Sequence, residues 1–200
     1  MSISASDVKA LRDKTGAGFM ECKSALAEAQ GDADQAMTIL RTRGLARAAK
    51  RAGRSTDQGL VGSYIHTGGK VGVLIEVNCE TDFVARTDDF QTLVKELAMH
   101  VAAASPLYVR REDVPVEVLE REKGIFRSQL ESQKRPAHVL DRILEGKLES
   151  YYQDTVLLDQ PSIRDPTTTV GQLVAAAIAK MGENVTVSRF ARFKLGEGAA

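Results

Sequence analysis

The chain has 200 residues, 43% hydrophobic and 27% charged, which is enough for one or two compact domains with a buried core. Lysine plus arginine and aspartate plus glutamate each number 27, so the formal net charge is zero. Proteins that coat nucleic acid carry a strong excess of basic residues, which this chain lacks. We therefore expect no direct nucleic-acid partner. There is no disulfide framework, no opening signal peptide and no apolar run long enough for a membrane, so we expect a cytoplasmic protein without a membrane partner.

Residues 1–54 are predicted to form three short helices. Glycines separate the helices, and Asp32 is expected to cap the third, which Gly44 would stop. Apolar residues recur at helical spacing and are expected to face the interior: Val8, Leu11, Phe19, Cys22, Leu26, Ala36, Ile39 and Leu40. The pattern resembles a ubiquitin-associated three-helix domain, a type that binds partners. The alternative is a cap that stabilises the rest of the fold.

A run of basic residues without an acidic one ends this segment: Arg41, Arg43, Arg47, Lys50, Arg51 and Arg54. Such a run can bind phosphate groups, because each neutralised phosphate releases counterions. The other interpretation is a solvated helix end followed by a linker, since cations stabilise the C-terminal end of a helix. No aromatic residue lies between the cations to stack on bases, which favours the second interpretation.

Residues 59–104 are predicted to form a β-hairpin followed by a helix. Two strands, 60–66 and 71–77, are joined by a turn that contains two glycines, and the second strand is rich in valine and isoleucine. Asp88 or Asp89 is expected to cap a helix whose apolar residues follow the helical period closely. That helix should therefore pack on one face of the hairpin.

The segment 81–86, Thr-Asp-Phe-Val-Ala-Arg, joins the second strand to this helix. Loops at such junctions often carry function, because the elements on either side hold them in place. Phe83, at the centre of the segment, has two interpretations. It is a core residue folded back under the junction, the commoner role for phenylalanine, or it is a wedge offered to a partner protein.

Residues 107–155 are predicted to form an antiparallel helical hairpin that turns at 132–135. Pro115 and Pro136 are placed to begin its two helices. The remaining residues are expected to return to the core as a short extended piece, a helix over 170–180 and a last strand.

The last strand is expected to pair with the hairpin and complete a small antiparallel sheet. Three strands are about the minimum for a stable sheet, and its open edges invite pairing with another chain. Its apolar residues lie on alternate positions, a face that Arg189 alone interrupts: Val185, Val187, Ala191, Phe193 and Leu195. The predicted fold class is α+β, with an N-terminal three-helix bundle, a small antiparallel sheet with packed helices, and an inserted helical hairpin. The predicted parts are a three-helix domain at 1–54, a core domain at 55–106 and 156–200, and the hairpin at 107–155.

The sequence contains no set of residues with the spacing of a catalytic or metal site. Its histidines are scattered, and none is placed to share a metal with a cysteine. Cys79, at a strand end, would be a nucleophile only beside a histidine, and a buried structural cysteine is the commoner role. Gly69-Lys70 lacks the serine or threonine that follows in a phosphate loop. We expect no catalytic residue, metal or cofactor, and a protein that is not an enzyme.

Several short motifs follow one another in order along the chain. The longest is 76–86, Glu-Val-Asn-Cys-Glu-Thr-Asp-Phe-Val-Ala-Arg. The others are Leu11-Arg12, Thr15-Gly16-Ala17-Gly18, Cys22-Lys23, Ala25-Leu26, Met99-His100-Val101-Ala102-Ala103, Thr169-Val170-Gly171-Gln172-Leu173, Arg192-Phe193 and Gly196-Glu197-Gly198. Taken together and in this order, they make the chain similar to the bacterial-type translation elongation factor Ts family over nearly its whole length.

The resemblance implies a guanine-nucleotide exchange factor for elongation factor Tu, a GTPase of protein synthesis. In that family a Thr-Asp-Phe-Val motif is pressed against the GTPase and disturbs its magnesium site. The corresponding residues here are Thr81, Asp82, Phe83 and Val84. The family's N-terminal bundle also touches the GTPase, and the residues so implied are Leu11, Phe19 and Met20.

The resemblance also implies how the chain is assembled. The helical hairpin matches the family's coiled-coil module. Longer members carry two strand-and-helix core units in tandem, whereas this sequence has one, since 99–105 follows Phe90 directly. Short members imply that a second chain supplies the missing half of the core. We therefore expect a homodimer built on the sheet.

Overall fold

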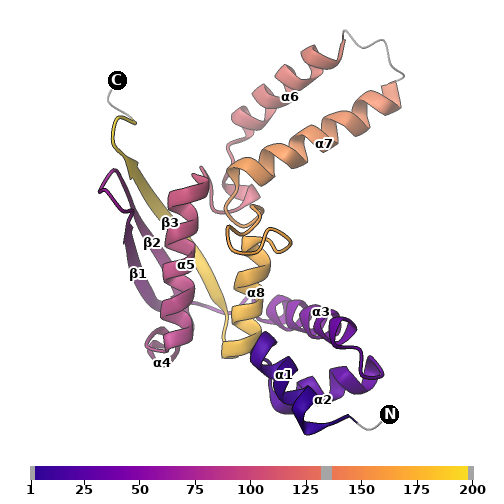
Figure 1. The fold of residues 1–200 in the computed structure, drawn as a ribbon. Coiled ribbons are helices and arrows are strands. Elements are labelled where there is room, and N and C mark those ends of the chain that lie inside the picture. The colour runs from indigo at the N-terminus through magenta and orange to yellow at the C-terminus, as the bar shows by residue number, and fades with distance from the viewer. Residues whose placement is uncertain (1–2, 132–136, 198–200) are drawn as a thin grey trace. The chain divides into compact units, whose positions relative to one another are not determined.

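The computed structural model describes residues 3–131 and 137–197. This part of the chain contains eight α-helices and a three-stranded antiparallel sheet with strand order β1-β2-β3 (Figure 1). The helices are α1 (Ala5–Thr15), α2 (Phe19–Glu28), α3 (Ala33–Arg51), α4 (Asp82–Ala85), α5 (Asp88–Ala104), α6 (Val116–Glu131), α7 (Ala137–Thr155) and α8 (Val170–Met181). The strands are β1 (Gln58–Ile65), β2 (Val71–Cys79) and β3 (Val185–Lys194), and a short 3-10 helix, η1, covers Arg111–Asp113. The predicted α+β class is confirmed.

The chain divides into two compact units, and the division runs through the strands and through α5. The first unit comprises 1–61, 76–94 and 172–187, and the second comprises 62–75, 95–171 and 188–200. The division made from the sequence, into a three-helix domain, a core domain in two segments and a hairpin, stays a prediction.

In the first unit, α1, α2 and α3 form a bundle with its own core. Ser4 caps α1 by accepting a hydrogen bond from the N–H of Asp7, and Gly16 ends this helix with a φ of 66°. Asp32 caps α3, as predicted, by accepting from two backbone N–H groups at 2.9 Å. The core consists of small and medium apolar residues: Val8, Leu11, Cys22, Ala25, Leu26, Ala29, Ala36 and Leu40.

Gly44 does not stop the third helix, and this prediction was wrong. Helix α3 continues through Gly44 to Arg51. A glycine inside a helix costs about 1 kcal/mol relative to alanine. Gly44 is buried, and a Cβ built on it would lie 3.4 Å from the Cβ of Ala179 in α8. Close packing of two helices at a residue without a side chain explains why this glycine lies within the helix.

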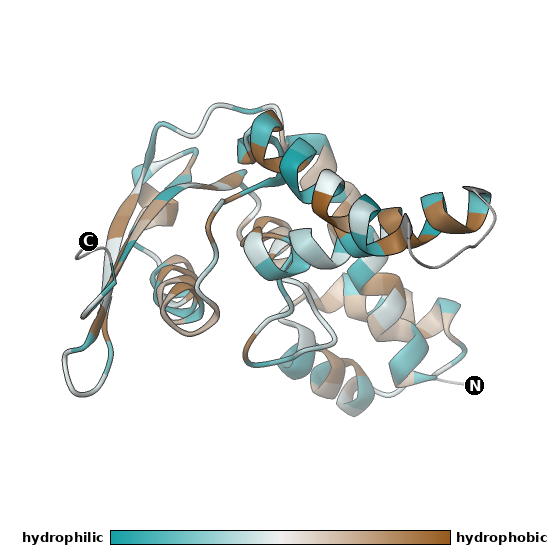
Figure 2. Cartoon of the chain, turned by 90° about the horizontal axis from the view of Figure 1, so that it is seen from above, coloured by the Kyte–Doolittle hydropathy of each residue, from teal (hydrophilic) through white to brown (hydrophobic). Residues whose placement is uncertain are grey.

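The sheet has one covered and one open face. Residues at alternate positions of β2 are buried on the face that α5 covers (Figure 1): Val73, Ile75, Val77 and Cys79. The apolar side of α5 is buried in turn, at Phe90, Leu93, Val94, Leu97, Ala98 and Val101. Hydrophilic and hydrophobic residues are mixed along each helix, as expected for elements that bury one side (Figure 2). The predicted packing of this helix on the hairpin is confirmed.

Strand β3 changes its covered side part-way along. Val185 and Val187 are buried as the alternation predicts, but Phe193 is 69% exposed. Phe190 and Arg192 are partly buried instead, and the Arg192 Nε donates to the carbonyl of Ala102 in α5 at 3.3 Å. One residue thus interrupts the alternation, the usual effect of a β-bulge. The predicted single apolar face is wrong for the second half of the strand.

In the second unit, α6 and α7 pair as the predicted helical hairpin (Figure 1). Leu130 is buried, and the Lys147 ammonium lies 5.2 Å from the centroid of the Phe126 ring. Lys147 also donates to Gln129 across the pair at 3.1 Å. The predicted turn at 132–135 and the start at Pro136 lie outside the described residues.

One arginine fastens the base of this hairpin. Arg111 binds Glu149 of α7 and Asp159 beyond it, each at 2.6 Å, and its guanidinium lies 4.6 Å from the centroid of the Tyr152 ring. A planar guanidinium suits this combination of two carboxylates and an aromatic face. The hairpin is therefore anchored at its base by polar contacts as well as by apolar packing.

His100 is a buried histidine held by a single hydrogen bond. The amide nitrogen of Gln160 donates to the carbonyls of Ala104 and Asp154, at 3.3 and 2.8 Å, so its amide oxygen is left to accept. That oxygen lies 2.9 Å from the His100 Nε2, which must therefore carry the proton. The His100 Nδ1 is buried without a hydrogen-bond partner. A second proton would therefore place a charge on a buried atom that has no acceptor.

This geometry predicts that acid weakens the fold. Burial lowers the pKa of His100 below its ordinary value of 6.5. The unfolded chain then binds a proton below about pH 6.5 that the folded chain does not, so stability is full above this pH and falls as pH drops. We expect urea unfolding at pH 7, 6 and 5 to show a loss of up to about 1.4 kcal/mol per pH unit from this group. The loss should be smaller in His100→Gln.

The matched control is His138→Gln, because His138 lies on the exposed surface of α7. The free energy of unfolding of each variant is subtracted from that of the unaltered protein at each pH. This difference removes the contribution of the carboxylates, which all three proteins share. Equal pH slopes for His100→Gln and His138→Gln would contradict the prediction.

Candidate functional site

The junction between β2 and α5 is built around the single turn of helix α4. Thr81 precedes α4 in an extended conformation, and its hydroxyl accepts a hydrogen bond from the N–H of Val84 at 3.4 Å. Thr87 closes the other end, where its hydroxyl donates to the carbonyl of Val84 at 2.7 Å. The same hydroxyl accepts from the N–H of Phe90 in α5 at 3.3 Å. A segment expected to be a loop is thus a capped helical turn.

The side chain of Phe83 points away from the protein. Phe83 is 78% exposed, whereas Ala85, two residues later, is buried. Asp82 pairs with Arg86 across the outer side of the turn at 2.8 Å. The interpretation of Phe83 as a core residue is therefore wrong. An aromatic ring held in water on an ordered turn is the kind of side chain that anchors a protein–protein contact.

The residues before α4 are held by the turn that leads from α8 to β3. Thr81 donates twice to Glu183, from its N–H at 3.0 Å and from its hydroxyl at 2.7 Å. Glu80 accepts from the N–H of Asn184 at 2.6 Å. Asn184 is buried, and its amide nitrogen donates to the carbonyl of Arg54 at 2.8 Å. These bonds join segments more than 100 residues apart, so the sequence gives no local signal for them.

Cys79 lies beneath the same junction as a structural residue. It is buried, and its thiol donates to the carbonyl of Thr81 at 3.1 Å. Burial raises the pKa of the Cys79 thiol, and the nearby carboxylate of Glu183 raises it further. A thiol that stays protonated is a poor nucleophile, so the geometry does not favour covalent chemistry here.

A sequence model of the family described as Elongation factor TS matches residues 5–197. The chain belongs to the elongation factor Ts family. The resemblance seen in the motifs is therefore confirmed, and the protein is a translation elongation factor.

Individual elongation factor Ts proteins match over almost their whole length. That of Fervidobacterium nodosum is 57% identical over 197 residues, which are 98% of this chain and 100% of that protein. That of Caldanaerobacter subterraneus subsp. tengcongensis is 58% identical over 196 residues, 98% of each chain. That of Geobacter sulfurreducens is 55% identical over 198 residues, 99% of this chain and 92% of that protein.

The N-terminal residues that the elongation factor Ts resemblance singled out differ in exposure. Phe19 and Met20 open α2 and are 46% and 68% exposed, so both are accessible. Phe19 was expected to face the bundle core, and that expectation was wrong. Leu11 is 3% exposed and belongs to the bundle core. We therefore assign Leu11 to packing rather than to direct contact.

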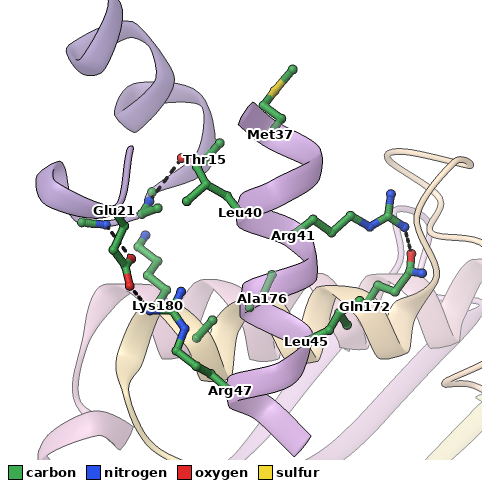
Figure 3. A pocket seen from close by; sticks show the side chains of 15 residues that line it. Thr15, Glu21, Met37, Leu40, Arg41, Leu45, Arg47, Gln172, Ala176 and Lys180 are labelled. Atoms are coloured by element: carbon green, nitrogen blue, oxygen red, sulfur yellow. Dashed lines mark hydrogen bonds and ion pairs between the residues drawn. The ribbon is translucent and has the colours of Figure 1, made fainter. Parts of the chain in front are cut away.

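Cations of the basic run bind acceptors within the first unit. A cavity of about 400 Å³ lies between α3, α8 and the loop before α2, and Figure 3 shows two of these cations on its wall. The bonds are Arg41 to Gln172, Arg43 to Glu28, Arg47 to Glu21 and Arg54 to Glu80. Three of these arginines are paired with carboxylates, whereas Arg41 binds a neutral amide, so most of the bonded cations are neutralised within the protein. This weakens the case for phosphate binding by the run.

No group of three or more histidine, cysteine, aspartate or glutamate side chains in the described part of the chain is arranged to hold a metal ion. Within the same residues, every helix is too short or too polar to cross a membrane.

Proposed function

We propose that this protein is a guanine-nucleotide exchange factor, which binds elongation factor Tu in its GDP-bound form and promotes GDP release during translation elongation in the cytoplasm. Membership of the elongation factor Ts family supports a role in elongation. The observation that carries the finer proposal is the exposed ring of Phe83 on the capped turn α4. The proposed contact residues there are Thr81, Asp82, Phe83 and Val84.

The proposed mechanism acts on the magnesium ion of the GTPase. Magnesium bridges nucleotide phosphates and protein oxygens, and it demands near-ideal octahedral geometry. An aromatic ring inserted between elements of the GTPase displaces the ligands of this ion and so weakens the hold on GDP. Burying the Phe83 ring contributes roughly 2–3 kcal/mol, which offsets part of that distortion.

This mechanism needs no covalent step and no catalytic side chain. Linkage requires reciprocity: if the factor weakens GDP binding by some ratio, GDP weakens binding of the factor by the same ratio. GTP then completes the exchange by binding to the emptied site and displacing the factor. The protein acts as a binding partner rather than as an enzyme.

The N-terminal bundle is proposed to supply a second contact with the GTPase. Phe19 and Met20 lie next to each other at the start of α2, and both present apolar surface. Exposed phenylalanine and methionine are typical of partner-binding surfaces. Leu11 is part of the bundle core rather than of this exposed surface.

The direct test is release of fluorescent GDP from elongation factor Tu. Addition of this protein should accelerate release in proportion to its concentration until the GTPase is saturated. If release is not accelerated, the exchange role is wrong, and RNA binding by the basic residues at 41–54 becomes the candidate. That activity would show a steep dependence on salt.

We also propose that the protein is a homodimer joined through the open face of its sheet. In the second unit, exposed apolar residues gather there from all three strands and the residue after β3: Ile65, Leu74, Phe193 and Leu195. A contiguous apolar patch of this kind marks an interaction surface. A second copy supplies the same patch, so a two-fold axis pairs apolar residues with apolar residues. In the same proposal, the α6–α7 hairpin is the coiled-coil module.

A further inference from the structure

The turn after α8 and the residues before α4 are joined by hydrogen bonds in which each segment supplies one carboxylate acceptor. Glu183 accepts from the N–H and hydroxyl of Thr81, while Glu80 accepts from the N–H of Asn184. Each segment thus contributes one carboxylate and receives another. Hydrogen bonds to ionised carboxylates are about twice as strong as neutral ones. This pair of bonds fixes the end of β2 against the start of β3.

The Thr81 hydroxyl has two roles that depend on each other. Its proton is directed to Glu183 at 2.7 Å, so its lone pair remains available to accept from the N–H of Val84. The second bond is the cap of α4. Glu183 therefore orients the hydroxyl that caps the turn, although it touches no residue of α4 through these bonds.

Besides its caps, the turn α4 is held by few backbone hydrogen bonds and by the exposed Asp82–Arg86 ion pair. It contains four residues, too few for a helix that is stable on its own. Of these four, only Ala85 is buried, and the Phe83 ring is 78% exposed. Apolar packing therefore does not fix the direction of the ring, and the polar caps at Thr81 and Thr87 do.

We infer that Glu183 is a positioning residue, which holds the first turn of α4 so that Phe83 is already oriented for its partner before binding. This inference rests on the proposed exchange function. Without Glu183, the turn would have to be ordered when the partner binds, and that entropy cost would lower the affinity. The ring itself would still be present, so the effect once bound would be small.

The expected result is a change in affinity with little change in maximal rate. For Glu183→Ala, we expect the concentration that gives half-maximal GDP release to rise about tenfold. The release rate at saturation should change less than about twofold. Glu183→Gln keeps one acceptor oxygen and should rise only about threefold. Phe83→Ala should instead lower the rate at saturation.

The matched control is Glu96→Gln. Glu96 is a partly buried glutamate on α5 that pairs with Arg164 at 2.6 Å and makes no bond to α4. This variant removes one carboxylate and one ion pair, as Glu183→Gln removes one carboxylate, and should leave both exchange parameters unchanged. Circular dichroism of each variant verifies that the fold is retained.

A second readout needs no partner at all. Hydrogen–deuterium exchange of the peptide covering 80–87 reports the order of α4 directly. Its amides should exchange about tenfold faster in Glu183→Ala than in the unaltered protein or in Glu96→Gln. Glu183 acts through the Phe83 ring, so its removal should matter only while the ring is present. In the Phe83→Ala background, adding Glu183→Ala should therefore not raise the half-maximal concentration further.

The outcomes separate the two proposals. If the unaltered protein accelerates GDP release but Glu183→Ala has the same half-maximal concentration, only the positioning role is overturned. The positioning role alone is also overturned if Glu183→Ala raises the half-maximal concentration as much in the Phe83→Ala background as in the unaltered protein. If the unaltered protein does not accelerate release, the exchange function fails and the positioning role fails with it.

Discussion

Phe83→Ala should lower stimulated GDP release from elongation factor Tu by about 30- to 150-fold, the equivalent of roughly 2–3 kcal/mol of lost apolar burial against the partner. The fold should be unaffected, because the ring is 78% exposed and contributes little to the core. The measurement is the release rate at saturating factor, together with thermal unfolding followed by circular dichroism. We expect the free energies of unfolding of the variant and the unaltered protein to differ by less than about 0.5 kcal/mol.

Leu107→Ala is the matched control for this prediction. Leu107 is also a large exposed apolar residue, and it lies between α5 and α6 rather than in α4. Its truncation should leave both release and stability unchanged. Strong destabilisation by Phe83→Ala would return the ring to a structural role, and unchanged release by a folded variant would exclude it from the contact.

Phe193→Asp should convert the proposed homodimer to a monomer. The ring is 69% exposed in the single chain and lies on the open face of the sheet. Each two-fold interface contains the residue twice, so a loss of about 3 kcal/mol per copy raises the dissociation constant by about 10⁴-fold. The measurement is sedimentation velocity at micromolar concentration, where the unaltered protein should sediment as a dimer.

Val116→Asp provides the comparison for this substitution. Val116 is as exposed as Phe193 but lies at the start of α6, where an acidic residue suits the helix N-terminus. This variant should remain dimeric. A monomeric unaltered protein with full exchange activity would refute the dimer.

Much of the fold follows from local patterns in the sequence. The hairpin, the amphipathic helix α5 and the cap at Asp32 each have a short-range signal of period or residue type. Gly44 was misjudged because a stop signal and a close helix contact use the same residue, and the contact with Ala179 is distant in sequence. The end of β3 was misjudged because one residue shifts its alternation.

The candidate site was likewise predictable from the sequence only in part. The motif at 81–84 is contiguous and was singled out from the sequence, although its helical form was not. Glu183 was missed because its partner Thr81 lies 102 residues away, and no local pattern relates a helix end to a strand end at that distance. Phe19 shows a different error, since helical spacing grouped it with the core residues Cys22 and Leu26 although it is 46% exposed at the start of α2.

The continuation of α3 past Gly44 bears on how tightly the factor holds its partner. The close approach of Gly44 to Ala179 seats α3 on α8, and the turn after α8 binds Thr81. The two proposed contacts, at Phe19 and Phe83, therefore lie on one compact unit rather than on two tethered pieces. Once either contact forms, the other is held at a high effective concentration and needs no search. The two contacts then act as one bivalent ligand, whose avidity would be lost if α3 bent at Gly44.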